Sequence, residues 1–208
     1  MTPTTPDYWS KAKADLRKRD QTLKRIIDSY RGEIMTLRGD AFFTLARSIT
    51  GQQISVKAAD SVWKKLSDRV GKMTPDIIAN TNAETLRACG LSERKVIYLH
   101  GVANHFLDNK KRIACWPAMP DEDIIAELTE IKGIGRWTAE MFLIFGLGRP
   151  DVFPLDDLGL LKGIYHHYGL GEKMPIKQII AIGESWRPWR SLGTWYMWRA
   201  LDPLPVIY

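Results

Sequence analysis

The sequence has 208 residues, 45% of them hydrophobic, which is enough for one sizeable core or two small lobes and leaves no room for a third domain. Lysine and arginine outnumber acidic residues by 30 to 24, and the resulting formal net charge of +6 favours a polyanionic partner. Residues 1–19 are polar and charged without an apolar run, which excludes a signal peptide or a membrane anchor in that stretch. We therefore expect an intracellular protein with no membrane partner.

Cysteine and histidine usage argues against a metal or redox cofactor. The two cysteines, Cys89 and Cys115, form neither a Cys-x-x-Cys motif nor a cluster that holds zinc or an iron–sulfur centre, and we expect both to be reduced. None of the four histidines combines i, i+4 spacing with a nearby acid, as a helical metal site would require. The sequence therefore predicts a protein that requires no cofactor.

Helical periodicity dominates the chain, and no stretch alternates apolar and polar residues convincingly over the length of a strand outside segments better explained as helices. The predicted fold class is all-α. In chain order, we expect helices over residues 8–30, 40–49, 55–70, 83–88 and 92–106, two more within 121–146, and then 157–168, 176–182 and 184–201. Residues 107–120 form the longest irregular stretch, which predicts a two-lobed arrangement with a cleft. The last helix is rich in tryptophan, which is more typical of a buried face than of a ligand pocket.

The two helices within residues 121–146 are joined by a tight glycine turn. Behind Pro120, which suits the start of a helix, apolar residues recur with a helical period. The period stops at Gly133 and Gly135 and then resumes towards Phe145. Glycine backbone beside the unpaired N–H groups of a helix start favours an anion such as a phosphate. The alternative is an ordinary helical hairpin in which the glycines only permit the turn.

An acidic pair, Asp156 and Asp157, follows the second hairpin helix and opens the next expected helix. The combination predicts a clamp for the DNA backbone with a carboxylate delivered beside it. The alternative is that one of these carboxylates only caps the helix that begins there.

Several segments occur in a specific order along the chain: GQQISV at 51–56, GLSERK at 90–95, GIGRWTA at 133–139, DVFPLDD at 151–157 and WRPWRS at 186–191. Together they resemble the helix-hairpin-helix glycosylase superfamily, specifically the 3-methyladenine DNA glycosylase II family. The resemblance covers roughly residues 40–201, and the ordered combination is far more specific than any one segment.

The resemblance implies two helical lobes around a DNA-facing cleft, with the hairpin on one DNA strand and a flipped base in the cleft. We expect one glycosylase unit over residues 1–208, with a first lobe at about 40–115, the hairpin at 121–146, and a second lobe from the N-terminal residues plus about 150–208. The roughly forty residues before the matching region are too few for the β-rich N-terminal domain of some members. The chain therefore resembles the compact form of the family.

Matching the acidic motif places the catalytic aspartate at Asp157, with Asp156 as its neighbour. Breaking an N-glycosidic bond leaves an oxocarbenium-like sugar, which a nearby carboxylate stabilises while it also steers or deprotonates the attacking water. An N3- or N7-alkylated purine already carries positive charge, so it leaves without a strong general acid.

Members of the superfamily that also cut the DNA backbone carry a nucleophilic lysine at the position occupied here by Trp137. An indole cannot form a Schiff base. The nearest lysine, Lys132, precedes the hairpin and is better placed to meet a phosphate. The sequence therefore predicts hydrolysis without lyase activity.

Trp137 and Trp198 match positions where the family places aromatic walls around the extruded base, and an electron-rich face suits a cationic alkylpurine. The alternative for Trp198 is core packing. Met141 and Leu158 fall at further pocket-lining positions where some relatives carry an aromatic residue. This departure leaves the range of damaged bases open.

The remaining candidate residues contact DNA or an ion. Gln53, in a turn between two helices, matches the wedge that fills the space of the flipped nucleotide, and the alternative is a polar turn residue. The expected hairpin contacts to DNA come from Lys132, Gly133, Gly135, Arg136 and Thr138. By resemblance, a structural Na⁺ or K⁺ would bind the main-chain carbonyls of Thr129, Ile131 and Ile134.

The resemblance thus implies a monomeric, monofunctional glycosylase of base excision repair that removes alkylated purines such as 3-methyladenine and 7-methylguanine from double-stranded DNA, with the preferred base left open. It would act in the nucleoid of a bacterium or the nucleus of a eukaryote. Two alternatives remain: a glycosylase for deaminated or oxidised bases, and a non-catalytic module that only grips phosphates. Asp157 separates the last from an enzyme, since a carboxylate facing a polyanion costs a pure binder affinity.

Overall fold

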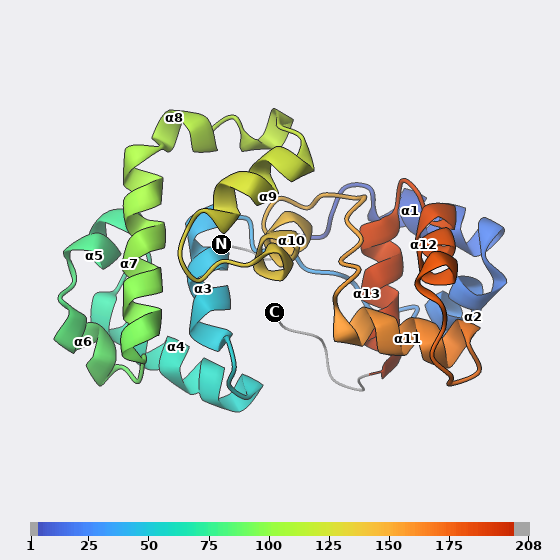
Figure 1. Ribbon diagram of the computed structural model, residues 1–208, viewed down its shortest axis with the longest axis horizontal. Helices are drawn as coiled ribbons and strands as arrows, with labels where there is room; N and C mark the ends of the chain where they lie inside the picture. Colours follow the sequence, from blue (N-terminus) through green and yellow to red (C-terminus); the bar gives the residue numbers. More distant parts are fainter. Residues whose placement is uncertain (1–3, 202–208) are drawn as a thin grey trace. The chain divides into compact units, whose positions relative to one another are not determined.

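The computed structural model describes residues 4–201, which contain 13 α-helices, one 3-10 turn and a single isolated β-bridge between Thr4 and Leu37 (Figure 1). The all-α prediction is confirmed. The described chain forms two compact units, which we name by their places in the sequence. Residues 38–142 form the central unit, and residues 4–37 with 143–201 form the terminal unit. No described helix combines the length and the apolar character needed to cross a lipid bilayer.

The central unit is built around its longest helix, α7 (Glu93–Asp108), against which α3, α5 and α6 pack (Figure 1). Polar side chains start its helices: Asp40 and Ser55 accept backbone N–H groups at the starts of α3 and α4, as Ser92 does for α7. Its elements are α3 (Ala41–Gly51), α4 (Val56–Val70), α5 (Pro75–Asn80), α6 (Ala83–Ala88), α7, α8 (Lys110–Ile113), η1 (Trp116–Ala118), α9 (Asp121–Thr129) and most of α10 (Arg136–Phe145).

The terminal unit is built around α13 (Arg190–Leu201), which packs against α1, α2, α11 and α12 (Figure 1). Trp9 stacks on Tyr196 at 5.8 Å and meets Trp195 edge-on at 5.1 Å, so the two ends of the chain share one aromatic core. The predicted burial of the tryptophan-rich face is confirmed. The other elements are α1 (Trp9–Arg19), α2 (Gln21–Ser29), α11 (Leu158–Tyr168) and α12 (Ile176–Ser185).

The prediction of one helix over residues 8–30 is wrong, because the helix is interrupted at Asp20, between α1 and α2. This residue is extended (φ −130°, ψ 111°), and its side chain accepts the backbone N–H groups that open α2. Its second oxygen accepts the Tyr168 hydroxyl at 2.7 Å and the Trp186 indole N–H at 3.1 Å. Asp20 therefore serves as a cap and as a polar anchor for two distant aromatic residues.

Two further predictions about helices are wrong. The helix expected over 184–201 begins only at Arg190, because residues 184–185 close α12 and Pro188, which has no backbone N–H to donate, follows. The stretch 107–120, expected to be irregular, holds the end of α7, then α8 and η1. Trp116 there is 1% exposed, packed edge-on against Phe106 and Phe142. The short helix α5 lies outside every predicted helix.

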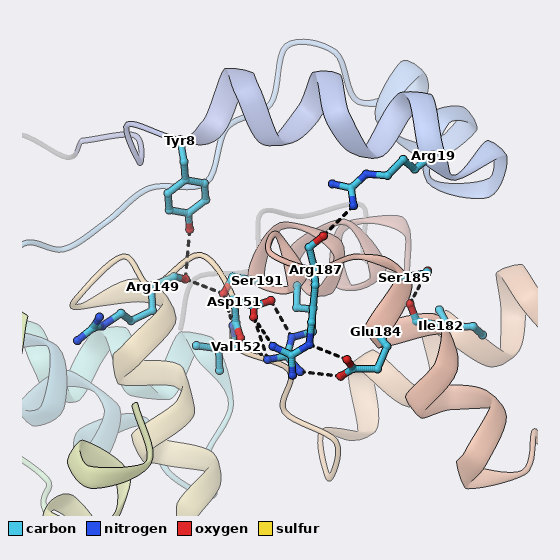
Figure 2. A network of polar contacts seen from close by, with 11 residues as sticks. Tyr8, Arg19, Arg149, Asp151, Val152, Ile182, Glu184, Ser185, Arg187 and Ser191 are labelled. Atoms are coloured by element: carbon cyan, nitrogen blue, oxygen red, sulfur yellow. Dashed lines mark hydrogen bonds and ion pairs between the residues drawn. The ribbon is translucent and has the colours of Figure 1, made fainter. Parts of the chain in front are cut away.

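A polar network holds residues 149–152, which precede Asp156 and Asp157, against the start of α13 (Figure 2). Asp151 pairs with the guanidinium groups of Arg187 and Arg190, at 2.7 and 2.8 Å. The buried Ser191 hydroxyl donates to the Arg149 carbonyl at 2.6 Å and accepts the Val152 N–H at 3.0 Å. These contacts therefore hold residues 149–152 in place at the start of the segment that leads to Asp157.

Candidate functional site

Asp157 lies at the start of α11 and is only 5% exposed. One of its oxygens, Oδ1, accepts the backbone N–H of Leu160 at 2.6 Å and the indole N–H of Trp198 at 2.7 Å. The first bond is the helix cap that the sequence allowed for, and the second comes from α13. Two donors on one oxygen fix the plane and direction of the carboxylate.

The surroundings of Asp157 are packed tightly enough to hold this geometry. A Cβ atom on Gly159 would lie 2.9 Å from Cδ1 of Trp198 and 3.1 Å from Asp157 Oδ1, so glycine admits the indole. The Trp198 ring is 2% exposed and stacks on Phe145 with ring centroids 5.9 Å apart. The structure therefore places Trp198 as the support of the carboxylate, a role that the sequence did not predict.

The neighbours of Asp157 in the sequence are exposed. Asp156 is exposed, and Leu158 at the first position of α11 is 70% exposed. The two carboxylates of the acidic pair thus differ sharply, because only Asp157 is buried and bonded to the indole. A fixed carboxylate at a helix start can stabilise positive charge that develops beside it.

The predicted glycine hairpin is confirmed in the central unit. Helix α9 ends at Thr129 and α10 begins at Arg136. Gly133 between them has φ +93°, and a Cβ there would lie 2.2 Å from the Tyr98 ring. Glycine is therefore required at this position both by conformation and by space.

The side chains around the hairpin differ in what they offer. Lys132 and Gly135 are exposed, Trp137 is 37% exposed, and Thr138 is buried. Arg136 donates to both oxygens of Glu122, at 2.9 and 2.6 Å, and its Nε to Glu140 at 3.1 Å. These bonds tie α9 to α10, and a phosphate contact by Arg136 stays a prediction.

The bond to Glu122 is the main reason that the pKa of the Arg136 guanidinium is raised, and it lowers the pKa of Glu122. The group is a permanent cation that is already matched by two acids. Its first role is therefore to hold the hairpin helices together.

The proposed cation ligands lie on the turn, where the Ile131 carbonyl accepts the Ile134 N–H at 3.0 Å. Thr129 ends α9 and donates its hydroxyl to the Ile125 carbonyl at 2.9 Å. A bound Na⁺ or K⁺ on these carbonyls stays a prediction.

Gln53 lies in the turn between α3 and α4, as predicted, with an exposed side chain. Its φ of +58° is unusual for a residue other than glycine. The wedge role stays a prediction. The preceding residue, Gln52, donates its side-chain N–H to the Gly133 carbonyl at 3.0 Å, a contact that no local pattern in the sequence predicts.

The candidate residues fall into both units. Asp157, Leu158 and Trp198 lie in the terminal unit, whereas Trp137 and Met141 lie in the central unit with the hairpin and Gln53. Met141 is 2% exposed. A base pocket lined by Trp137, Trp198, Met141 and Leu158 stays a prediction.

The fold and the hairpin define an all-α protein of the helix-hairpin-helix class. Residues 46–188 match the HhH-GPD superfamily of base excision DNA repair proteins. The chain is 33% identical over 201 residues to DNA-3-methyladenine glycosylase 1 of Schizosaccharomyces pombe, covering 91% of this chain and 86% of the relative.

Two solved structures have the same fold. The Schizosaccharomyces pombe 3-methyladenine DNA glycosylase in complex with abasic DNA superposes with a TM-score of 0.76 at 32% identity, covering 91% of this chain and 95% of that one. A DNA-3-methyladenine glycosidase from Bacillus halodurans gives 0.79 at 32% identity, with 96% and 92% covered. The chain belongs to the HhH-GPD superfamily.

Proposed function

We propose that this protein is a monofunctional DNA glycosylase that hydrolyses the N-glycosidic bond of alkylated purines in double-stranded DNA and leaves an abasic site. The observation that carries the proposal is the buried Asp157 carboxylate, held by the Leu160 N–H and the Trp198 indole at a helix start. The glycosylase relatives named above support the same reaction.

The reaction requires little from the protein beyond a fixed negative charge. The C1′–N bond breaks, its electron pair leaves with the positively charged alkylpurine, and the sugar becomes oxocarbenium-like. Asp157 stabilises that cation and orients a water, whose oxygen bonds to C1′ and whose proton passes to the carboxylate. The products are a free neutral base and an abasic sugar.

Trp137 supports hydrolysis without strand cleavage, because an indole has no amine to form a Schiff base with the sugar. Borohydride would then trap no covalent complex between the protein and lesion-containing DNA. A trapped adduct would remove this part of the proposal.

The hairpin supports DNA binding through backbone N–H groups and the exposed Lys132. A Na⁺ or K⁺ on the carbonyls of Thr129, Ile131 and Ile134 would add positive charge beside the phosphate and take no part in bond breaking. A single damaged base requires only one hairpin and one catalytic carboxylate, so the protein acts as a monomer. It acts in the compartment that holds the genome. Light scattering with and without duplex DNA tests the oligomeric state.

The decisive experiment measures release of free bases from randomly methylated DNA and resolves 3-methyladenine from 7-methylguanine. Asp157→Asn is the informative variant, because its amide oxygen still accepts the two N–H donors and the fold is kept. Asp156→Asn is the matched control, with the same change on the exposed neighbour. We expect Asp157→Asn to lose at least about 100-fold in rate and Asp156→Asn to stay near wild type.

Retained or tighter binding of Asp157→Asn to abasic-analogue DNA, together with lost base release, would support the enzyme. Absence of base release by wild type from methylated DNA would point to another lesion class. Absence of release from any damaged DNA, with duplex binding retained, would point to a phosphate-gripping module.

A further inference from the structure

The side chain of Gln52 joins two segments that are far apart in the sequence. Gln52 caps the C-terminal end of α3, and its Nε2 donates to the main-chain carbonyl of Gly133 at 3.0 Å. The two residues are separated by 81 positions. A single amide therefore links the turn after α3 to the first glycine of the hairpin.

Helix α7 holds the same two segments from one face. Lys95 donates its ammonium to the Thr50 carbonyl in the last turn of α3 at 2.8 Å, where a cation also suits the helix dipole. Burial lowers the pKa of this lysine. Tyr98, three residues later on the same face, lays its ring against Gly133. The end of α3 and the hairpin are thus positioned on a common support.

Gln53 directly follows Gln52 and adopts the left-handed conformation at φ +58° with its side chain exposed. A residue with a Cβ occupies this conformation only where its surroundings hold it. The Gln52 amide is one such hold, because it fixes the residue before the strained position. The direction of the exposed Gln53 side chain therefore depends on a bond to the hairpin.

We propose that Gln52 is a positioning residue that couples the turn bearing Gln53 to the glycine hairpin, so that the two meet duplex DNA as one rigid surface. The inference rests on the proposed function and deepens it. It assigns Gln52 no contact with the reacting atoms. The coupling matters on duplex, where the hairpin grips a strand while Gln53 fills the space of the flipped nucleotide, and not on single strands, which leave no such space.

The test replaces Gln52 by methionine, which keeps the length of the side chain and removes the donor. Gln178→Met makes the same change on the exposed surface of α12 in the terminal unit and serves as the control. We expect Gln52→Met to lower kcat/KM on methylated duplex by about tenfold, through KM, and to leave activity on methylated single strands within about twofold. The control should match wild type on both substrates.

Amide hydrogen exchange supplies a readout that needs no activity. Without DNA, the amides of residues 131–135 should exchange faster in Gln52→Met than in wild type, while those in the terminal unit stay unchanged. An unchanged hairpin would overturn the proposal.

A double-mutant cycle with Gln53→Ala tests the coupling itself. If Gln52 acts by aiming Gln53, the combined loss on duplex is smaller than the product of the two single losses. Multiplicative losses, or equal losses on duplex and single strands in Gln52→Met, would overturn the proposal. Base release by wild type on the same substrates keeps this outcome separate from a failure of the proposed function.

Discussion

Asp157 and the glycine hairpin are held in place in opposite ways, the first by side-chain and backbone donors and the second by the absence of a side chain. At Asp157, an indole N–H and a backbone N–H both donate to one buried carboxylate oxygen and hold it in place. At the hairpin, the absence of a side chain at Gly133 leaves space for the Tyr98 ring and permits the turn at φ +93°. The structure around Asp157 is therefore disrupted when a donor group is removed, whereas the hairpin is disrupted when a side-chain atom is added at Gly133.

The largest effect should come from adding one methyl group to the hairpin. In Gly133→Ala the new Cβ overlaps Tyr98 in a conformation that alanine resists, and we expect a loss of about 3 kcal/mol in the free energy of unfolding. Gly135→Ala is the matched control, because a Cβ there meets no atom within 4 Å apart from its two chain neighbours. Chemical denaturation of both variants measures the difference.

The same pair of variants also tests whether hairpin backbone approaches DNA. Gly135→Ala should keep wild-type stability and lose several-fold in duplex affinity, as a methyl group would stand between backbone and phosphate. Unchanged affinity in Gly135→Ala would break the comparison, since glycine would then serve the turn alone.

A smaller effect should follow removal of the donor at Asp157. Trp198→Phe deletes the indole N–H and keeps an aromatic ring against Phe145, and we expect about 2 kcal/mol of lost stability with base release reduced about 10- to 100-fold. Trp189→Phe removes an indole donor to Asp15 in the same unit and is the control. It should lose stability without the drop in base release from folded protein. Equal rates in the two variants would remove the support role of Trp198.

The smallest effect should come from the network that leads to the acidic motif. Ser191→Ala leaves the buried Val152 N–H without its hydroxyl partner and should cost about 1 to 2 kcal/mol, seen as a lower melting temperature. Ser185→Ala removes an exposed hydroxyl bonded to the Ile182 carbonyl and should change little (Figure 2). A loss in Ser185→Ala as large as in Ser191→Ala would show that burial does not set the difference.

Local signals predicted what depends on neighbours in the sequence. Pro120 and the two glycines located the hairpin, and the apolar period located α3, α4 and α7 close to their observed bounds. The acidic pair located the start of α11. In each case the residue that sets the structure lies inside the segment that it shapes.

What the sequence could not predict depends on distant partners. Asp20 breaks a periodic stretch because Tyr168 and Trp186 come to it from the other end of the chain. The bonds from Trp198 to Asp157 and from Gln52 to Gly133 are equally long-range. Pro188 was a local signal against a single helix over 184–201, and the tryptophan spacing obscured it.

The division of the chain into units has a consequence for the order in which its contacts can form. The central unit is one uninterrupted stretch, so a ribosome delivers all of its core in sequence. Helices α1 and α2 precede the central unit in the sequence, whereas α13, against which they pack, follows it. Trp9, Leu16 and Ile27 can therefore reach their native burial only after the chain has passed through the whole central unit, so the core of the terminal unit depends on contacts of long sequence separation, which form slowly.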